Sequence, residues 1–344
     1  MSSNAPSPII PPLVDAFGRV HTSLRLSVTD RCNIRCVYCM PAGDVKFLPR
    51  NQILSFEEIQ RVVGVVAAMG VDRIRLTGGE PLVRAQLPEL IRKLRAVEGV
   101  AEIALTTNGI LLADQADELR QAGLDRINIS LDSLNAETFR KIARRDGLDR
   151  VLAGIDAAQR AKFAKVRINA IAMRGLTEGE AAQLVGFARS RGLELRFIEY
   201  MPLDADGAWR RDDVLSGEEL REIIEREHGP LTPAPRDDPS QPAVDYDFVD
   251  CPHAEGGGRI GFINPVTQPF CGDCNRLRLT AEGQVRNCLF STSEWDARAL
   301  LRSGGTDAEL ATLIRDAVAA KKPGHGIDDT GFLRPERAMY QIGG

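Results

Sequence analysis

Two groups of three cysteines are the residues in this sequence best suited to chemistry. They are Cys32, Cys36 and Cys39, spaced CxxxCxxC, and Cys271, Cys274 and Cys288, spaced CxxC with thirteen residues before the third cysteine. Thiolates bind iron–sulfur clusters and structural zinc. A closed zinc site takes four ligands, and neither group has an obvious fourth, although His253 lies near the second group. Three thiolates on a 4Fe–4S cluster would leave one iron open and reactive. The two groups therefore predict two such clusters, with zinc as the alternative for each.

The remaining cysteine and the composition indicate a globular protein of a reducing compartment. Cys251 matches no ligand motif, and we expect it to be structural. The chain has 344 residues, 43% of them hydrophobic and 27% charged, and a formal net charge of −4, which gives no reason to expect nucleic-acid or membrane binding. The longest apolar run, 62–70, is too short to cross a bilayer, and residues 1–12 lack the features of a signal peptide. We expect a cytoplasmic protein.

An alternation of apolar β-rich runs and helical runs must position these cysteines. Strands are predicted at 24–29, 73–77, 101–106, 126–131, 166–172 and 194–199, and helices at 56–69, 87–97, 114–122, 149–161 and 179–191. This spacing predicts a parallel sheet with helices outside. A polar or glycine-rich cluster lies at or near the end of each strand, and in a barrel these strand ends share the face that holds the active site. Because the GxGxxG turn of a Rossmann sheet is absent, we predict an α/β fold with a partial (βα)6 TIM-type barrel.

Composition divides the chain into four parts. Residues 1–16 are predicted to be a flexible tail, 17–228 the partial barrel, 229–245 a proline-rich linker, and 246–344 a C-terminal α+β segment that closes the barrel mouth. Within that segment, short strands are predicted at 246–249, 259–263 and 276–280, the last forming a hairpin with 284–289, and a helix at 307–321. The C-terminal segment carries the second cysteine group and ends in Gly343-Gly344.

Motifs along the chain resemble those of the radical S-adenosylmethionine (SAM) enzymes. The pattern CxxxCxYC follows the first predicted strand, and GGEP follows the second. Further motifs resemble the GTP 3′,8-cyclase family of molybdenum-cofactor biosynthesis: TDRCNIRCVYCMP, RIRLTGGEPLVR, LTTNG, RINISLDSL, LRFIEYMP, FCGDCNRLRLTAEG and the terminal Gly-Gly. The resemblance runs from about Phe17 to Gly344. It implies that a 5′-deoxyadenosyl radical removes the C3′ hydrogen of GTP, that the ribose radical attacks C8 of guanine, and that reduction gives 3′,8-cyclo-7,8-dihydro-GTP.

The resemblance also implies roles for particular residues. The first cluster would be held by Cys32, Cys36 and Cys39, and the second, whose open iron binds the guanine, by Cys271, Cys274 and Cys288. SAM would be contacted by Tyr38, Gly79, Glu80, Ser130 and Met201. GTP would be contacted by Arg25, Arg75, Thr106, Arg167, Arg276 and Arg278. Arg276, Arg278, Gly343 and Gly344 would join the first three cysteines as catalytic residues. Arg167 stands where the family usually has lysine, so a point charge has become a planar fork there.

The resemblance implies partners as well: GTP, a low-potential electron donor of the flavodoxin or ferredoxin type, and a second copy of the chain in a homodimer. Two alternatives stay open from the residues alone. The first is another radical SAM enzyme whose auxiliary cluster serves a different substrate, such as a peptide. The second is a non-catalytic protein with structural zinc.

Overall fold

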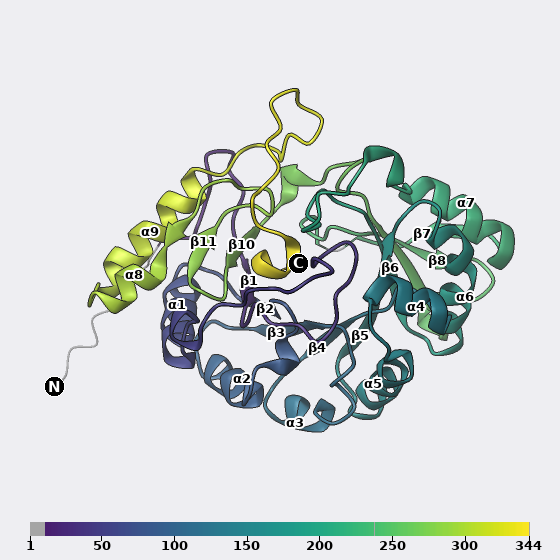
Figure 1. The fold of residues 1–344 in the computed structure, drawn as a ribbon, viewed down its shortest axis with the longest axis horizontal. Coiled ribbons are helices and arrows are strands. Elements are labelled where there is room, and N and C mark those ends of the chain that lie inside the picture. Colours follow the sequence, from purple (N-terminus) through teal and green to yellow (C-terminus); the bar gives the residue numbers. More distant parts are fainter. Residues whose placement is uncertain (1–10, 237, 344) are drawn as a thin grey trace.

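Six βα repeats form the frame of the molecule (Figure 1). The computed structural model describes residues 11–236 and 238–343. The strands are β1 (Ser23–Ser27), β2 (Arg73–Thr77), β3 (Glu102–Thr107), β4 (Arg126–Ser130), β5 (Lys165–Ala172) and β6 (Glu194–Glu199). The helices are α1 (Phe56–Ala68), α2 (Leu87–Arg95), α3 (Ala116–Gln121), α4 (Ala136–Ala143), α5 (Leu148–Arg160) and α6 (Thr177–Ser190). Every strand and helix predicted in this part is present within two residues at either end, whereas α4 was not predicted.

Side-chain alternation along the strands separates an apolar outer face from a polar inner one. In β2, Ile74 and Leu76 are buried under the helices, whereas Arg73 and Arg75 on the opposite face are only half-buried. Successive strand residues point to opposite faces, so this arrangement follows from the sequence RIRLT. The helices are started by local signals: Ser55 caps α1 in a capping box with Glu58. The fold thus buries its aliphatic residues outside the curved sheet and directs its arginines inward.

Over the described residues the sheet has twelve strands, because C-terminal strands extend both of its edges. Its order is β12-β11-β10-β1-β2-β3-β4-β5-β6-β9-β8-β7. The added strands are β7 (Leu231–Pro233), β8 (Val244–Phe248), β9 (Arg259–Ile263), β10 (Arg276–Leu279), β11 (Gln284–Arg286) and β12 (Trp295–Asp296). Both β10 and β9 pair in parallel with the barrel strands, to β1 and β6 respectively. The outermost strands β12 and β7 do not pair with each other within the described chain, so the predicted partial barrel is confirmed as an open one.

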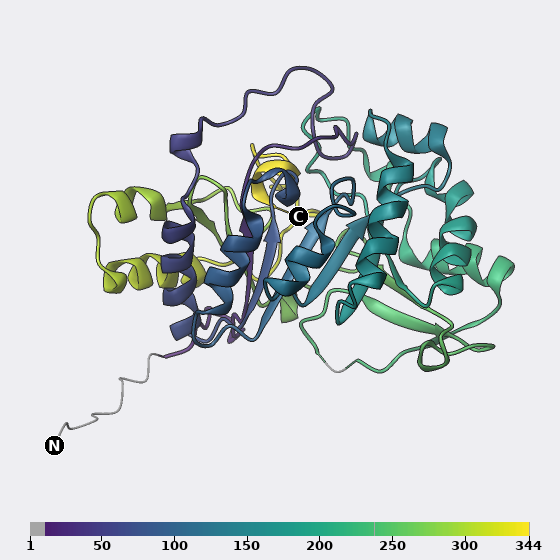
Figure 2. The same cartoon turned by 90° about the horizontal axis from the view of Figure 1, so that it is seen from below.

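The rest of the C-terminal half covers the ends and the mouth of this sheet. Helix α7 (Gly217–His228) lies beside α6, while α9 (Asp307–Ala319) lies beside α1, and α8 (Ala297–Arg302) lies beside α9. The short helix α10 (Met339–Ile342) lies inside the curve of the sheet in two perpendicular views (Figures 1 and 2). The segment predicted as a linker contains β7 and the first residues of β8. Its prolines confine β7 to the edge of the sheet, where no backbone donor is needed on the outer side.

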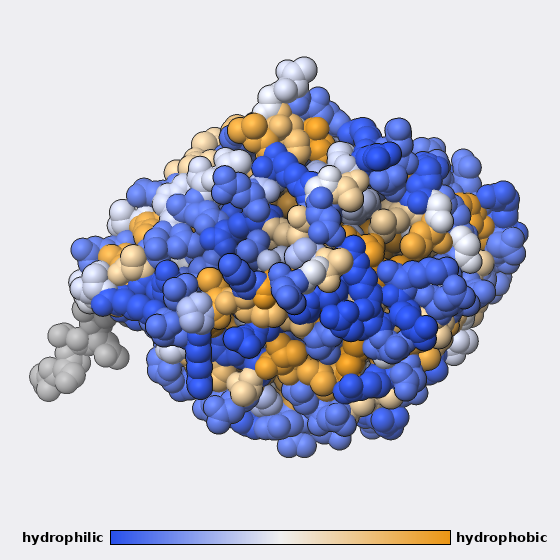
Figure 3. Space-filling view, viewed as in Figure 1, coloured by the Kyte–Doolittle hydropathy of each residue, from blue (hydrophilic) through white to orange (hydrophobic). Residues whose placement is uncertain are grey.

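Hydrophilic side chains cover most of the face seen in Figure 3, and apolar side chains form scattered patches between them. Among the described residues, no helix has both the length and the apolar character needed to span a bilayer.

Candidate active site

A cavity of about 310 Å³ lies at the carboxyl ends of the strands, and all six cysteines of the two groups line it. Each of these six cysteines is free and half-buried. The first group enters from the loop after β1, and the second from the segment before β10 and the loop after β11. The structure thus brings both predicted ligand groups to one space, although more than 230 residues separate them in the chain.

The loop of the first cysteine group is held by the glycines that follow β2. The Gly79 N–H donates to the Thr29 carbonyl at 2.8 Å, and the Glu80 N–H donates to the Arg31 carbonyl at 2.7 Å. A Cβ at Gly79 would overlap the Arg31 carbonyl and lie 2.8 Å from that of Asp30. Glycine is needed here because the two loops touch backbone to backbone.

Glu80 braces two loops of the cavity wall. Its carboxylate accepts hydrogen bonds from the Leu82 N–H (2.9 Å), the Thr107 hydroxyl (2.7 Å) and the Asn108 N–H (2.7 Å). Burial raises its pKa to about 7, against the opposing effect of these three donors. The resemblance implies that Glu80 contacts SAM. Although it lines the cavity, both its oxygens are already bonded within the protein.

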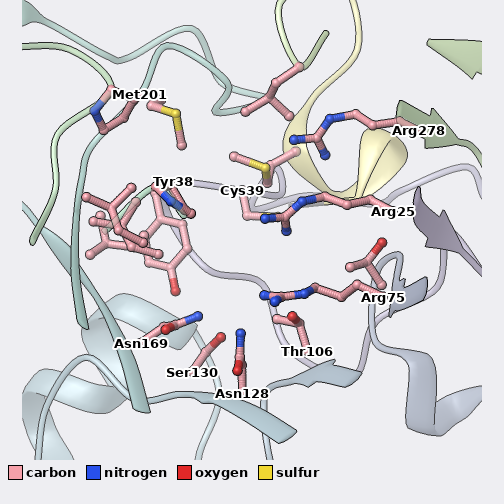
Figure 4. Close-up of a pocket in the computed structure, with 18 of the residues that line it drawn as sticks. Arg25, Tyr38, Cys39, Arg75, Thr106, Asn128, Ser130, Asn169, Met201 and Arg278 are labelled. Carbon is pink, nitrogen blue, oxygen red and sulfur yellow. The ribbon is translucent and has the colours of Figure 1, made fainter. Parts of the chain in front are cut away.

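Neutral polar side chains form one side of the cavity (Figure 4). Tyr38, Asn128, Ser130 and Asn169 gather there, with Met201 above them. Asn169 Oδ1 is buried and has no hydrogen-bond partner within the described residues, which leaves it available to a ligand.

Asp132, which sequence reasoning missed, fixes the Tyr38 ring. The Tyr38 hydroxyl donates to Asp132 Oδ2 at 2.7 Å, and the Ile171 N–H donates to Asp132 Oδ1 at 2.8 Å. Burial raises the pKa of Asp132 to about 6. The available signal was its place in Ser-Leu-Asp-Ser directly after β4, at the same sheet edge as the other polar clusters.

Guanidinium groups form the opposite side of the cavity (Figure 4). Arg278, Arg25 and Arg75 come from neighbouring strands in register: Arg25 is opposite Arg278 on β10 and opposite Arg75 on β2. No carboxylate pairs with these three in the described chain. Burial first, and then repulsion from neighbouring arginines, lower the pKa of each; that of Arg278 falls to about 9. Three adjacent cations without a carboxylate partner in the described chain are suited to bind an anionic ligand.

Two further residues assigned to substrate binding line the same cavity. Arg276 lies over the Phe270 ring, and its Nε is buried with no partner among the described residues. Thr106 Oγ1 is likewise buried and unpartnered within the part of the chain that is described. Both therefore have hydrogen-bonding capacity left for a ligand.

Arg167 lies apart from this group. It does not line the main cavity but a second one of about 90 Å³, formed by the first residues of the strands. There its guanidinium is paired with Glu194, and Arg196 beside it is paired with Asp245 at 3.0 Å. Arg167 is opposite Asn128, two residues before Asn169 along β5, which puts it deeper in the barrel. The two cavities adjoin, because Arg25, Arg75 and other residues line both.

The C-terminal tail enters the site beside these cations. Arg278 donates to the Gly343 carbonyl. A Cβ at Gly343 would overlap the hydroxyl oxygens of Thr77 and Ser27, and Gly343 has a φ of +77°. The tail therefore fits only with glycine at this position. Gly344, the other residue predicted here, lies outside the described residues.

The two cysteine groups have opposite electrostatic surroundings. Burial, and then the charge of Glu80, raise the pKa of Cys32 to about 11. Burial also acts on Cys274, but Arg276 and Lys321 outweigh it and hold the pKa of this thiol at about 6. The first group thus lies among acids and the second among cations.

Comparison with known proteins agrees with this geometry. Residues 26–188 match the family model of the radical SAM superfamily, and residues 193–327 match the model described as Molybdenum Cofactor Synthesis C. Two solved structures of Streptococcus suis SuiB share the fold: one superimposes with a TM-score of 0.60, 14% identity and coverage of 90% of this chain and 68% of that one. The other, with SAM bound, gives a TM-score of 0.59, 13% identity and coverage of 86% and 68%. The class of the protein is thus a radical SAM enzyme, to which a 4Fe–4S cluster and SAM belong.

Curated relatives define the family more narrowly. A GTP 3′,8-cyclase of Rhodopirellula baltica is 53% identical, over 96% of this chain and 92% of that protein. Those of Corynebacterium glutamicum and Mycolicibacterium smegmatis are 48% and 45% identical, covering 96% and 99% of this chain and 89% and 94% of theirs. The chain belongs to the GTP 3′,8-cyclase family of the radical SAM superfamily.

Proposed function

We propose that this enzyme cyclises GTP to 3′,8-cyclo-7,8-dihydro-GTP, and that the three cations Arg25, Arg75 and Arg278 bind the triphosphate. The observation that carries the proposal is that these guanidiniums share one cavity with both cysteine groups and have no carboxylate partner in the described chain. A triphosphate carries several negative charges, and guanidinium forks match its oxygens in geometry and charge.

We assign the first cysteine group to the cluster that belongs to the class. Its three free cysteines lie in the loop after β1 and line the cavity, and three thiolates would leave one iron of a 4Fe–4S cluster open. When bound there, the cluster and SAM would supply a 5′-deoxyadenosyl radical able to remove the C3′ hydrogen. Tyr38, Gly79, Ser130 and Met201 line the adjoining side of the cavity and would hold SAM.

The second cysteine group is proposed to hold a second 4Fe–4S cluster, whose open iron binds the guanine. Its donor set fits, because three free thiols face the cavity and the cations around Cys274 favour its thiolate form. In the described part of the chain, no three metal-binding side chains converge as they do around a single ion. The thiolates of a cubane bind different irons, so they stand further apart than the ligands of one ion.

The protein's own contribution is to position GTP and exclude water. The three cations Arg25, Arg75 and Arg278 would hold the triphosphate on one side of the cavity, and the second cysteine group would hold the guanine through its cluster. The ribose between them would then face the side of the cavity proposed to bind SAM. Gly343, directly after α10, accepts a hydrogen bond from Arg278, and this segment would shield a radical in the cavity from solvent. Arg167 is proposed to act on GTP indirectly: it lies in the adjoining cavity, and its positive charge would add to the electrostatic potential that attracts the triphosphate. Glu80 is proposed to position the loops at the SAM side.

Family membership supports three further parts of the proposal. A low-potential donor of the flavodoxin or ferredoxin type would supply the electrons, two copies of the chain would form a homodimer, and the enzyme would act in the cytoplasm. Cys251 lies outside the cavity lining, in keeping with the structural role predicted for it.

Anaerobic GTP binding by wild-type protein, with and without reconstituted iron, tests the substrate site. Cys271→Ala is compared with Cys251→Ala as a matched control. The proposal expects Cys271→Ala to bind GTP more weakly than wild type when both proteins carry reconstituted iron, and equally well when neither does. Cys251→Ala is expected to bind GTP as wild type does in both states. Equal binding by loaded wild type and Cys271→Ala would contradict guanine binding at the second cluster, and no GTP binding in any form would contradict the substrate.

A further inference from the structure

Lys321 is a buried lysine beside the second cysteine group. It is 4% exposed and follows directly after α9 and its capping residue Ala320. Its Nζ lies 3.4 Å from Cys274 Sγ, 3.2 Å from the Cys274 carbonyl and 2.9 Å from the Arg276 carbonyl. An ammonium group has three N–H donors, and here each has one acceptor. Two of the acceptors belong to Cys274, so Lys321 holds both the backbone and the sulfur of that residue.

A second buried cation fixes the segment that carries Lys321. The Arg19 guanidinium donates to the Lys322 carbonyl at 2.8 Å, to that of Pro323 at 3.0 Å and to that of Cys271 at 2.8 Å. Asp15 pairs with Arg19 and is fully enclosed. The chain after α9 is therefore tied to the loop of the second cysteine group from two sides. Lys321 is held in place independently of its own contact with sulfur.

The positive charge of Lys321 has no carboxylate partner in the described chain. Burial lowers the pKa of Lys321, against the opposing effect of the neighbouring thiols Cys274 and Cys288. A buried charge is costly unless it is paired. The negative charge that balances Lys321 would therefore come from the thiolates and whatever they bind. The positive charge of Arg276 also acts on the sulfur of Cys274 and favours its thiolate form.

We propose that Lys321 is a positioning residue that raises the reduction potential of the iron–sulfur cluster held by Cys271, Cys274 and Cys288. This inference rests on the second cluster of the proposed function. Reduction adds one negative charge to the cluster, and a fixed cation that donates to a ligand sulfur stabilises that charge. The N–H donor also withdraws electron density from Cys274 Sγ, which acts in the same direction.

The reduction potential of the second cluster, followed by EPR during an anaerobic titration, tests this role. The full chain carries Cys32→Ser, Cys36→Ser and Cys39→Ser, so that only the second cluster gives a signal. In this background Lys321→Met is compared with Lys322→Met, a neighbouring exposed lysine. At a fixed potential, Lys321→Met is expected to lower the ratio of reduced to oxidised cluster about tenfold, which is about 59 mV for one electron. Lys322→Met is expected to leave the ratio unchanged.

Iron and sulfide content, measured first, separates the two proposals. Absence of a cluster in the parent background would refute the second cluster itself. A Lys321→Met variant that keeps its cluster at the parent potential would overturn the role of Lys321.

If Lys321→Met takes up no iron, the role of Lys321 is tested instead by pulsed EPR on the protein with the three cysteine-to-serine changes, labelled with ¹⁵N-lysine. The proposal expects a ¹⁵N coupling to the reduced cluster that is also present in Lys322→Met. Absence of that coupling would overturn it.

Discussion

Replacing Gly343 by alanine is expected to undock the C-terminal tail while leaving the barrel intact. Gly343 has φ and ψ of +77° and +103°, a conformation that costs a non-glycine residue about 1–3 kcal/mol. The new Cβ would also overlap the hydroxyls of Thr77 and Ser27 and lie 3.2 Å from Thr77 Cβ. Such crowding in a packed site costs about 1–3 kcal/mol more. A total of at least about 2 kcal/mol lowers the docking equilibrium constant roughly 30-fold.

Two measurements report this loss independently. Hydrogen exchange at the Gly343 amide, which is bonded to the Met339 carbonyl, reports docking, and the rate of GTP cyclisation reports its consequence. We expect faster exchange at residue 343 in Gly343→Ala, a fall in turnover and an unchanged melting temperature. Gly331→Ala is the matched control, because a Cβ there meets nothing within 4 Å. Wild-type exchange and turnover in Gly343→Ala would refute the steric reasoning.

Three further predictions concern single groups in the cavity. Arg75→Met is expected to weaken GTP binding about tenfold or more, from the loss of charge-assisted hydrogen bonds, whereas the exposed change Arg92→Met leaves the dissociation constant unaltered; equal constants would remove Arg75 from the phosphate site. In metal-free protein the pKa of Cys274 is about 6, below its unfolded value, so its contribution to stability is present above pH 9 and is lost as the pH falls through 6. Its alkylation by iodoacetamide, followed by peptide mass spectrometry, should show an inflection near pH 6, and an inflection near 9 would contradict the effect of the neighbouring cations. Tyr38→Phe removes the donor to Asp132 and is expected to weaken SAM binding severalfold by calorimetry; an unchanged affinity would show that the ring is held without that bond.

The barrel repeats could be predicted because their signals are local. β2 and β6 occupy the residues predicted for them, since each is a short alternating run between a helix end and a polar cluster. Helix α4 was missed although Asn135 caps it, because it follows β4 after only five residues, 131–135, where the strand end was expected. Helix α7 was also missed, although Ser216 and Glu219 form a capping box at its start.

The arrangement of the C-terminal strands could not be predicted from local signals. Pairing of β10 with β1 joins residues some 250 positions apart. The sequence RLRL of β10 does not indicate which edge of the barrel sheet this strand extends. That pairing is what places Arg278 beside Arg25. The resemblance implies that both residues contact the substrate, and the structure shows that they lie opposite each other on paired strands. It also shows what the motif could not, that Arg167 is engaged by Glu194 below the main cavity.

Buried residues that support the site residues were also missed from the sequence. Asp132 and Lys321 belong to no metal or phosphate motif, and a lone aspartate or lysine in sequence is most often a surface residue. Their positions became informative only when the fold placed them against Tyr38 and Cys274.

Transfer of hydrogen from GTP to SAM-derived 5′-deoxyadenosine is the most direct test of the proposed reaction. Anaerobic, iron-reconstituted protein is mixed with dithionite, SAM and GTP deuterated at C3′, and the products are analysed by mass spectrometry. The account predicts deuterium in 5′-deoxyadenosine together with a cyclised dihydro-GTP. Formation of 5′-deoxyadenosine without deuterium, with GTP unchanged, would contradict it.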